Sequence, residues 1–374
     1  MKEDNMKQGW EIIPFEDSIV KVKYTTKVPS NDYLDKGLYP IVSQEEGLVC
    51  GYWNNANDLF KVSTPVVIFG DHTRILKYID FDFVLGADGV KILQPIENIN
   101  AKFLKYYLQY CKIPSLGYSR HYKLLKELQV PVPPLSVQEQ IVSELDLLSG
   151  IIEKKREQLK EFDALAQSIF YDMFGDPITN EMGWEVKKLG EVCESVSYGT
   201  SNSSTENGEY KYLRMNNITY SGHIDITDIK YIDVSDDEYE KYVVRKGDIL
   251  FNRTNSKDLV GKTALFNFEE EMIIAGYIIR VRVNQDSIIP TLVVKWLNTP
   301  LMKSYFKNIC KGAVNQSNIN SKELKNIPIS IPPLPLQRQI ASKIEAIERQ
   351  KELIKQSISE TETLFNARMQ EHFG

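Results

Sequence analysis

Two stretches of this chain combine basic and aromatic residues and contain no acidic residue. The first runs from Asn98 to Lys126, and the second runs from Ser287 to Ser321 and is followed at once by Lys322. The whole chain has a formal net charge of −6 and a pI near 5.5, so these stretches depart from its average. Two such segments at matching places predict two phosphate-facing surfaces. A solvated helix face is the ordinary alternative for any single run of charge.

Side chains that can read base edges lie inside these stretches and in two polar turns. Arginine can bond guanine O6 and N7 as a pair, and asparagine or glutamine can do the same with adenine N6 and N7. The first stretch offers Lys112, Ser119, Arg120, His121, Tyr122 and Lys123. The second, with the lysine that follows it, offers Lys311, Asn315, Gln316, Ser317, Asn318, Asn320 and Lys322. Turns after two strand-like runs offer His72, Thr73 and Arg74, and Asn252, Arg253, Thr254 and Asn255. Each could also be an ordinary turn. Because the two sets differ chemically, they would read different bases.

Patterns that resemble catalytic motifs also occur, but each departs from its motif. Val260-Gly261-Lys262-Thr263 resembles the end of a phosphate-binding loop, although Ser256 stands where that loop requires glycine. Gly117–His121 resembles a nucleophile elbow but ends in histidine. Glu185-Val186-Lys187 resembles part of a nuclease site, yet the corresponding Glu11-Ile12-Ile13 lacks the lysine. We therefore expect no catalysis by the chain itself, no cofactor and no metal.

The candidate residues lie in two copies of one framework. Pro133-Pro134-Leu135 returns as Pro332-Pro333-Leu334, an offset of 332 − 133 = 199 residues. The offset holds without a gap to the ends of the copies, where Phe174-Gly175 becomes Phe373-Gly374. A repeat this long is a duplicated domain and not a solenoid unit. It predicts approximate two-fold symmetry and a function that needs two similar heads.

The heads themselves differ more than the framework. Each copy begins with Gly-Trp-Glu, at Gly9 and Gly183, an offset of 183 − 9 = 174, so 199 − 174 = 25 extra residues lie inside the second head. Divergent loops on a shared scaffold are a common way to change what a protein recognises. Drift after duplication would produce the same difference.

A long helix should follow each proline pair, because apolar residues recur at alternating steps of four and three. The first series is Ile141, Leu145, Leu148, Ile152, Leu159, Phe162, Ala166, Ile169 and Met173, with Lys155 in a polar slot. The second is Ile340, Ile344, Ile347, Ile354, Ile358 and Phe365, with Lys351 and Thr361 in polar slots. These seams predict two helices of roughly 35 residues that span about 50 Å each and pair as an antiparallel coiled coil. Separate packing of each helix on its own domain is the alternative.

The heads should be mixed α/β. Strands are expected at Pro65–Phe69, Asp248–Phe251 and Ile273–Val283, and helices at Lys102–Cys111 and Leu292–Cys310. The fold class is therefore α+β.

The composition is that of an ordinary soluble protein of two or three domains. No run approaches the roughly 18 apolar residues of a membrane span, and the charged start is not typical of a signal peptide. The four cysteines Cys50, Cys111, Cys193 and Cys310 contain no CxxC pair, which indicates reduced thiols in a cytoplasmic protein.

The tandem of variable heads, each followed by Pro-Pro-Leu-x-x-Gln-x-Gln-Ile, resembles the DNA-specificity (S) subunits of type I restriction-modification systems. Val130–Ile141 and Ile329–Ile340 fit the segment that opens the family's conserved helix, and Gly247–Phe251 fits its target-recognition domains. The resemblance implies target-recognition domains at 1–130 and 176–328. It implies conserved spacer helices at 131–175 and 329–374.

For function, the resemblance implies that each head binds one part of a split, asymmetric target in double-stranded DNA. The helix pair would set the length of the unread spacer. It also implies two methyltransferase (M) subunits, which bind S-adenosylmethionine and methylate a flipped-out adenine, and restriction (R) subunits for ATP-driven cleavage. The acidic pI leaves less electrostatic help for DNA binding by the free subunit. The alternative is a two-headed coiled-coil scaffold that bridges two protein partners without reading DNA.

Overall fold

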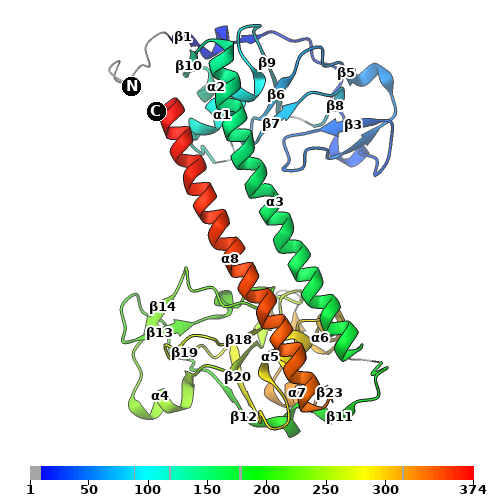
Figure 1. Ribbon diagram of the computed structural model, residues 1–374, viewed down its shortest axis with the longest axis vertical. Coiled ribbons are helices and arrows are strands. Elements are labelled where there is room, and N and C mark those ends of the chain that lie inside the picture. The colour runs from blue at the N-terminus through cyan, green and yellow to red at the C-terminus, as the bar shows by residue number, and fades with distance from the viewer. Residues whose placement is uncertain (1–9, 88, 118, 177–178, 314–315) are drawn as a thin grey trace. The chain divides into compact units, whose positions relative to one another are not determined.

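Contacts divide the chain into two units, each of which is described separately. The computed structural model describes residues 10–87, 89–117, 119–176, 179–313 and 316–374. Unit 1 comprises Met1–Glu157 and Lys355–Gly374, and unit 2 comprises Gln158–Ile354. Each unit therefore joins one head to the first part of one long helix and the last part of the other (Figure 1).

Unit 1 contains, among its described residues, two four-stranded sheets and one two-stranded sheet. Its strands are β1 (Glu11–Pro14), β2 (Ile19–Val20), β3 (Tyr39–Val42), β4 (Gly51–Trp53), β5 (Leu59–Phe60), β6 (Val66–Gly70), β7 (Leu76–Ile79), β8 (Phe83–Leu85), β9 (Val90–Pro95) and β10 (Gln129–Val132). The sheet orders are β2-β9-β6-β7, β4-β3-β8-β5 and β1-β10; β3 and β8 pair in parallel, and the other strand pairs among the described residues of this unit are antiparallel. Helices α1 (Ala101–Tyr110) and α2 (Tyr122–Leu125) lie between β9 and β10 in the chain. β6 is buried throughout, as expected for an apolar, β-branched run, and α1 packs against it.

Unit 2 repeats this arrangement with additions. Its strands are β11 (Glu185–Lys188), β12 (Cys193–Tyr198), β13 (Tyr210–Leu213), β14 (Lys230–Ile232), β15 (Val243–Val244), β16 (Ile249–Asn252), β17 (Thr254–Asn255), β18 (Thr263–Leu265), β19 (Met272–Ile274), β20 (Ile278–Val283), β21 (Lys311–Ala313), β22 (Gln316–Asn318) and β23 (Pro328–Ile331). Its short helices are α4 (Asp236–Tyr242), α5 (Pro290–Leu297), α6 (Pro300–Ile309) and α7 (Ser321–Lys325). The orders β12-β20-β16-β18, β14-β13-β19-β15 and β11-β23 match those of unit 1, and β17-β22-β21 is an addition.

Two element predictions for the second head were too long. The expected strand Ile273–Val283 is split into β19 and β20, because these strands belong to different sheets and the chain crosses from one to the other. The expected helix Leu292–Cys310 is split into α5 and α6 at Thr299-Pro300. Proline cannot continue a helix from the preceding turn, and the Thr299 hydroxyl caps the new helix by accepting from the N–H of Met302 at 3.3 Å.

The long helices α3 (Leu135–Phe174) and α8 (Leu334–Phe373) are 40 residues each, somewhat longer than predicted. In unit 1 the first part of α3 meets the last part of α8, where Arg368 Nε lies 2.8 Å from Glu144 Oε1. In unit 2 the last part of α3 meets the first part of α8, where Lys351 Nζ lies 2.6 Å from Asp163 Oδ1. These contacts confirm the antiparallel pairing. Two helices side by side are visible in Figure 1.

The predicted polar slots of the helix seam interact with polar groups. Lys155 Nζ donates to Ser357 Oγ at 2.6 Å and to Thr361 Oγ1 at 3.1 Å, so two of the slots meet directly. Lys351 is 4% exposed and also contacts Glu348 at 3.0 Å. The ammonium groups therefore keep hydrogen-bond partners inside an otherwise apolar seam, which is the condition for burying them.

The repeated glutamine of the Pro-Pro-Leu-x-x-Gln motif holds each head on its helix. Gln138 is fully buried; its Oε1 accepts from the N–H of Asn100 at 2.8 Å, and its Nε2 donates to the carbonyls of Asn98 and Pro133, both at 2.8 Å. Gln337 does the same in unit 2 with Ile289, Ser287 and Pro332. The motif is thus a structural clamp between the start of each long helix and the loop before α1 in unit 1 or α5 in unit 2.

The phenylalanine of the repeated Phe-Gly pair, at the end of each long helix, packs in the unit that contains the other copy's head. Phe373, near the end of α8, packs against the rings of Phe103, Tyr107 and Tyr110 in unit 1, at centroid distances of 5.4, 5.7 and 5.8 Å. Phe174, at the end of α3, is 2% exposed in the core of unit 2 and stacks on Phe170 at 4.7 Å. Each helix therefore closes the apolar core of the unit in which it ends.

Candidate nucleic-acid interface

In unit 1 the turn after β6 and the loop after α1 are fastened together by His121. The Asp71 carbonyl accepts from the His121 N–H at 2.8 Å, and His121 Nδ1 lies 2.9 Å from the same oxygen. The N–H of Leu116 donates to Nε2 at 2.9 Å, so Nδ1 is the nitrogen that carries the hydrogen. His121 is fully buried. Both ring nitrogens are thus engaged by the main chain, and the imidazole positions the loop that carries Ser119 and Arg120.

The turn itself is tied to two neighbouring loops. Thr73 Oγ1 donates to the Gln44 carbonyl at 2.7 Å, and Gln44 Oε1 accepts from the N–H of His72 at 3.2 Å. Arg74, with a φ of 64°, donates from Nη1 to the Ile113 carbonyl at 3.0 Å. His72, Thr73 and Arg74 are therefore brought beside the loop of the first basic stretch. Nothing in the local sequence marked Gln44, because its role depends on a contact across 28 residues.

The first basic stretch has both exposed and half-buried candidates. Lys112, Arg120 and Lys123 are exposed, whereas Ser119 and Tyr122 are half-buried. The Tyr122 N–H donates to Asp71 Oδ1 at 2.7 Å, and the ammonium of Lys91 lies 5.2 Å from the centre of the Tyr122 ring. Burial raises the pKa of the Tyr122 hydroxyl, so it stays a neutral donor.

Several lysines of the two basic stretches are paired with carboxylates. The pairs are Lys102 with Asp146, Lys126 with Glu16, Lys295 with Glu348, Lys307 with Asp258 and Lys311 with Glu323. Burial opposes ionisation of Glu348, but Lys295 and Lys351 lower its pKa to about 2. Among the described residues, Lys112, Lys123 and Lys322 make no ion pair, so their charge remains available to phosphates. Fewer lysines of the two basic stretches are therefore available to phosphates than the sequence indicated.

Unit 2 fastens its turn and loop through the same main-chain positions. The Arg253 carbonyl accepts from the N–H of Ile319 at 2.9 Å, and the Arg253 N–H donates to the Tyr277 carbonyl at 2.9 Å. In unit 1 the Asp71 N–H donates to the Gly89 carbonyl at 2.7 Å. Arg253 therefore takes the place of Asp71, and fully buried Ile319 takes that of His121.

The remaining candidates of unit 2 surround a small three-stranded sheet. β17 pairs with β22, which pairs with β21, so Thr254 and Asn255 lie opposite Asn318 and Ser317. Asn318 Nδ2 donates to Thr254 Oγ1 at 2.7 Å, and Asn255 Nδ2 donates to the Oδ1 of fully buried Asn252 at 3.3 Å.

The other residues of this set differ in exposure and role. Gln316 and Lys322 are exposed and Ser317 is 2% exposed. Asn320 caps α7 by accepting from the N–H of Glu323 at 2.9 Å, and its side chain therefore has a structural partner. Asn315 lies outside the described residues.

Tyr198 is a neighbour of this site that the sequence did not reveal. Its ring lies 4.7 Å below the guanidinium of Arg253, and its hydroxyl accepts from the N–H of Ser321 at 2.8 Å. Tyr198 ends β12, far from Arg253 in the chain, and the sheet order β12-β20-β16 brings the two strands into one sheet.

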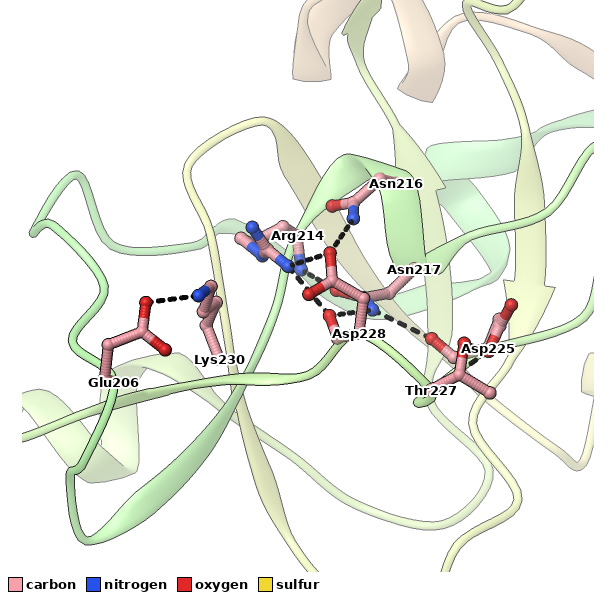
Figure 2. A network of polar contacts seen from close by, with 8 residues as sticks. All are labelled: Glu206, Arg214, Asn216, Asn217, Asp225, Thr227, Asp228 and Lys230. Carbon is pink, nitrogen blue, oxygen red and sulfur yellow. Dashed lines mark hydrogen bonds and ion pairs between the residues drawn. The ribbon is translucent and has the colours of Figure 1, made fainter. Parts of the chain in front are cut away.

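Part of the 25-residue excess lies in the loop after β13, residues 214–229, whose counterpart after β3 is residues 43–50. Figure 2 shows the polar network that orders it. Arg214 Nη2 donates to Asp228 Oδ2 at 2.9 Å, Asn216 Nδ2 donates to the same oxygen at 3.2 Å, and Asn217 Nδ2 donates to the Asp225 carbonyl at 2.8 Å. Lys230 and Glu206 form an ion pair at the edge of the network.

A buried lysine supports this loop in each unit. Lys77 Nζ donates to the Ser43 carbonyl at 2.8 Å, and Lys262 Nζ donates to the Met215 carbonyl at 2.9 Å. Burial lowers the pKa of both amines. Lys262 is thus a structural donor to the main chain, which agrees with rejecting the phosphate-loop interpretation.

Comparisons with known proteins place the chain in a family. The profile of the Type I restriction modification DNA specificity domain matches residues 7–161 and 181–363. The putative type I restriction enzyme MjaX specificity subunit of Methanocaldococcus jannaschii is 36% identical over 161 residues, which cover 42% of this chain and 38% of that protein. The type I restriction enzyme EcoKI specificity subunit of Escherichia coli is 24% identical over 268 residues, 66% of this chain and 57% of that protein. The matches thus span less than two thirds of these two relatives.

A solved structure supports the fold. The type I restriction-modification system S subunit from M. genitalium aligns with a TM-score of 0.63 and 14% identity, over 100% of this chain and 98% of that chain. None of the helices in the described part of the chain has the length and apolar character needed to cross a membrane. Since the family profile matches most of its length, this protein belongs to the family of type I restriction-modification DNA specificity subunits.

Proposed function

We propose that the protein binds double-stranded DNA and reads a split, asymmetric sequence, one part with each unit. The observation that carries the proposal is the shared fastening of turn and loop, through Asp71 and His121 in unit 1 and through Arg253 and Ile319 in unit 2. A common main-chain scaffold that presents different side chains is suited to reading two different sequences. The exposed Lys112, together with Lys322 in unit 2, supplies phosphate contacts.

In this proposal residues 1–130 and 176–328 act as target-recognition domains, and the paired helices set the spacer. The chain supplies recognition, while two methyltransferase subunits carry out adenine methylation and restriction subunits carry out cleavage. Family membership supports these partners, and the helix pair offers them a surface in each unit. The complex would act in the cytoplasm.

A pair of substitutions in unit 1 tests the DNA-reading function. Arg120→Ala should relax recognition in one half of the target only, because a base contact carries sequence information. Lys112→Ala should weaken binding to all sequences and reduce the salt dependence by about one counterion. Both are measured as binding of specific and random duplexes by the methyltransferase complex across a salt series.

Lys154→Ala is the matched control, because Lys154 is an exposed lysine on α3 outside the candidate surface. Equal losses on specific and random DNA for Lys112→Ala and Arg120→Ala would contradict base reading by Arg120. Failure of the unaltered complex to prefer any sequence would contradict the proposed function and favour a protein scaffold.

A further inference from the structure

We propose that Arg253 reads a guanine in the half-site bound by unit 2, and that Tyr198 is the positioning residue that orients its guanidinium. This inference rests on the proposed DNA-reading function. It adds the base that is recognised and the side-chain pair that recognises it.

The main chain of Arg253 is fixed on both sides. The residue lies between β16 and β17, where its N–H donates to the Tyr277 carbonyl and its carbonyl accepts from the Ile319 N–H, each at 2.9 Å. The following Thr254 pairs with Asn318 in the added sheet. The Cα–Cβ direction of Arg253 is therefore set by two neighbouring strands and the loop after α6.

The guanidinium also has two contacts within unit 2 that restrict its position. It lies 4.7 Å from the centre of the Tyr198 ring, and Nη1 donates to the Gly276 carbonyl at 3.2 Å. Nε is buried and has no hydrogen-bond partner among the described residues. The terminal nitrogens are therefore the donors that can meet a ligand, and two parallel N–H groups match guanine O6 and N7.

Tyr198 is itself fixed at its far end. Its hydroxyl accepts from the N–H of Ser321 at 2.8 Å and donates to Ser321 Oγ at 2.9 Å. The ring is 38% exposed, so it forms part of the surface and not of the core. Stacking of a guanidinium on an aromatic face restricts the rotamers of the arginine and leaves its donors, which point outward in the guanidinium plane, free to bond.

The charge of Arg253 is uncompensated within the part of the chain that the structure describes. Two other arginines of unit 2 are paired: Arg245 with Glu271 at 2.9 Å and Arg282 with Asp248 at 2.7 Å. No carboxylate of the described residues pairs with Arg253. An arginine held by an aromatic ring without an acidic partner is available for an electron-rich base edge.

The matching position of unit 1 cannot make this contact. It is occupied by Asp71, which is 2% exposed and whose carboxylate accepts from the Tyr122 N–H at 2.7 Å and lies 3.8 Å from Lys91 Nζ. A carboxylate has no hydrogen to donate to guanine O6 or N7. At this position of the scaffold, a guanine contact is therefore open to unit 2 alone.

The test uses the full chain in its methyltransferase complex and a duplex that carries the recognised sequence. Each guanine is replaced, one at a time, by 7-deazaguanine, which lacks the N7 acceptor. The unaltered complex should lose about tenfold or more in affinity at one position of the half-site read by unit 2. Arg253→Ala and Arg253→Lys should lose a similar factor on the natural duplex and lose nothing further at that position.

Tyr198 is tested by two variants that separate its ring from its hydroxyl. Tyr198→Leu should reduce the 7-deazaguanine effect at the same position, whereas Tyr198→Phe should keep most of it. Lys241→Ala, which removes another cation–ring contact of unit 2 (5.0 Å to Tyr242), should leave the effect unchanged and is the matched control. Thermal unfolding of each variant checks that it folds.

The outcomes separate the two proposals. If the unaltered complex prefers its sequence but Arg253→Ala keeps the same 7-deazaguanine sensitivity at every position, the role of Arg253 is refuted while DNA reading stands. If Tyr198→Leu behaves as the unaltered complex does, the positioning role of Tyr198 is refuted. If the unaltered complex shows no sequence preference, the proposed function itself fails.

Discussion

The two units fasten their candidate surfaces in the same way but with opposite chemistry. In unit 1 a buried histidine and a buried aspartate hold the turn and the loop together, and the loop is irregular. In unit 2 a buried isoleucine and a stacked arginine occupy those positions, and the loop contains the strands β21 and β22. Main-chain hydrogen bonds carry the shared architecture, so the side chains at these positions are free to differ. The comparison explains how one duplicated scaffold can present two different surfaces.

The largest expected effect on stability is at the helix ends, because the terminal phenylalanine is more deeply buried in unit 2 than in unit 1. Phe174→Ala should destabilise unit 2 by about 3–5 kcal/mol, because Phe174 is fully enclosed in its core. Phe373→Ala should destabilise unit 1 by less, because Phe373 is half-buried. Amide hydrogen exchange resolved by unit measures both. If either variant destabilised both units equally, or destabilised mainly the unit in which its helix begins, the assignment of each helix end to its unit would be contradicted.

A smaller effect, equal in the two units, is expected at the glutamine clamp. Gln138→Leu and Gln337→Leu should each destabilise their own unit by about 2–3 kcal/mol, because each leaves a buried N–H and two buried carbonyls without their partner. Hydrogen exchange in α1 and α5 measures the loss. Gln109→Leu, at an exposed position of α1, is the control. Clearly unequal losses would show that the two clamps are not equivalent.

Substitutions at His121 and Ile319 should have different effects on stability and on base recognition. His121→Leu should cost about 1–3 kcal/mol, because the Leu116 N–H loses its acceptor, and it should relax recognition in the half-site of unit 1. Ile319→Val should cost only about 1 kcal/mol and leave recognition unchanged, because its fastening bond is made by the main chain. Competition binding with single-base variants of each half-site measures recognition. If the His121 variant kept its recognition, the claim that the His121 side chain positions the loop of unit 1 would be contradicted.

The smallest expected effect is a dependence of the stability of unit 2 on pH. Burial and the charge of Lys262 lower the pKa of Lys303 to about 7 from its usual 10.5. Between these values the unfolded chain binds the proton and the folded chain does not, so this lysine makes stability rise with pH from about 7 to about 10. Lys303→Met should therefore raise the melting temperature by a few degrees at pH 6 and by less at pH 10. The Gly261 carbonyl keeps Thr263 Oγ1 as a donor in this variant. A pH-independent difference would contradict the buried charge.

Much of the scaffold could be predicted from the sequence because it is periodic or repeated. The heptad seams predicted the paired helices, and the polar slots Lys155 and Thr361 meet as partners. Periodicity could not reveal that Pro300 splits a helical run, because the apolar pattern continues across it.

The candidate sites were predictable only as far as residue type allows. Residue type identified Arg253 in unit 2 and Thr73 in unit 1. Tyr198, which contacts Arg253, and Gln44, which contacts Thr73, are brought into place by contacts between distant segments. His121 has the chemistry of a base reader, but in the folded chain it is buried and both of its ring nitrogens contact the main chain. Long-range contacts of this kind leave no local pattern in a single sequence.

The most direct test is single-molecule methylation sequencing of cells that express the chain with its methyltransferase partner. It should compare the unaltered chain with one that carries an extra heptad at matching points in α3 and α8. We predict a split, asymmetric motif whose two specific parts are the same in both cases. The spacer should lengthen by roughly three base pairs, because seven helical residues add about 10 Å and each base pair rises about 3.4 Å. A continuous motif, or an unchanged spacer in the extended chain, would contradict the account.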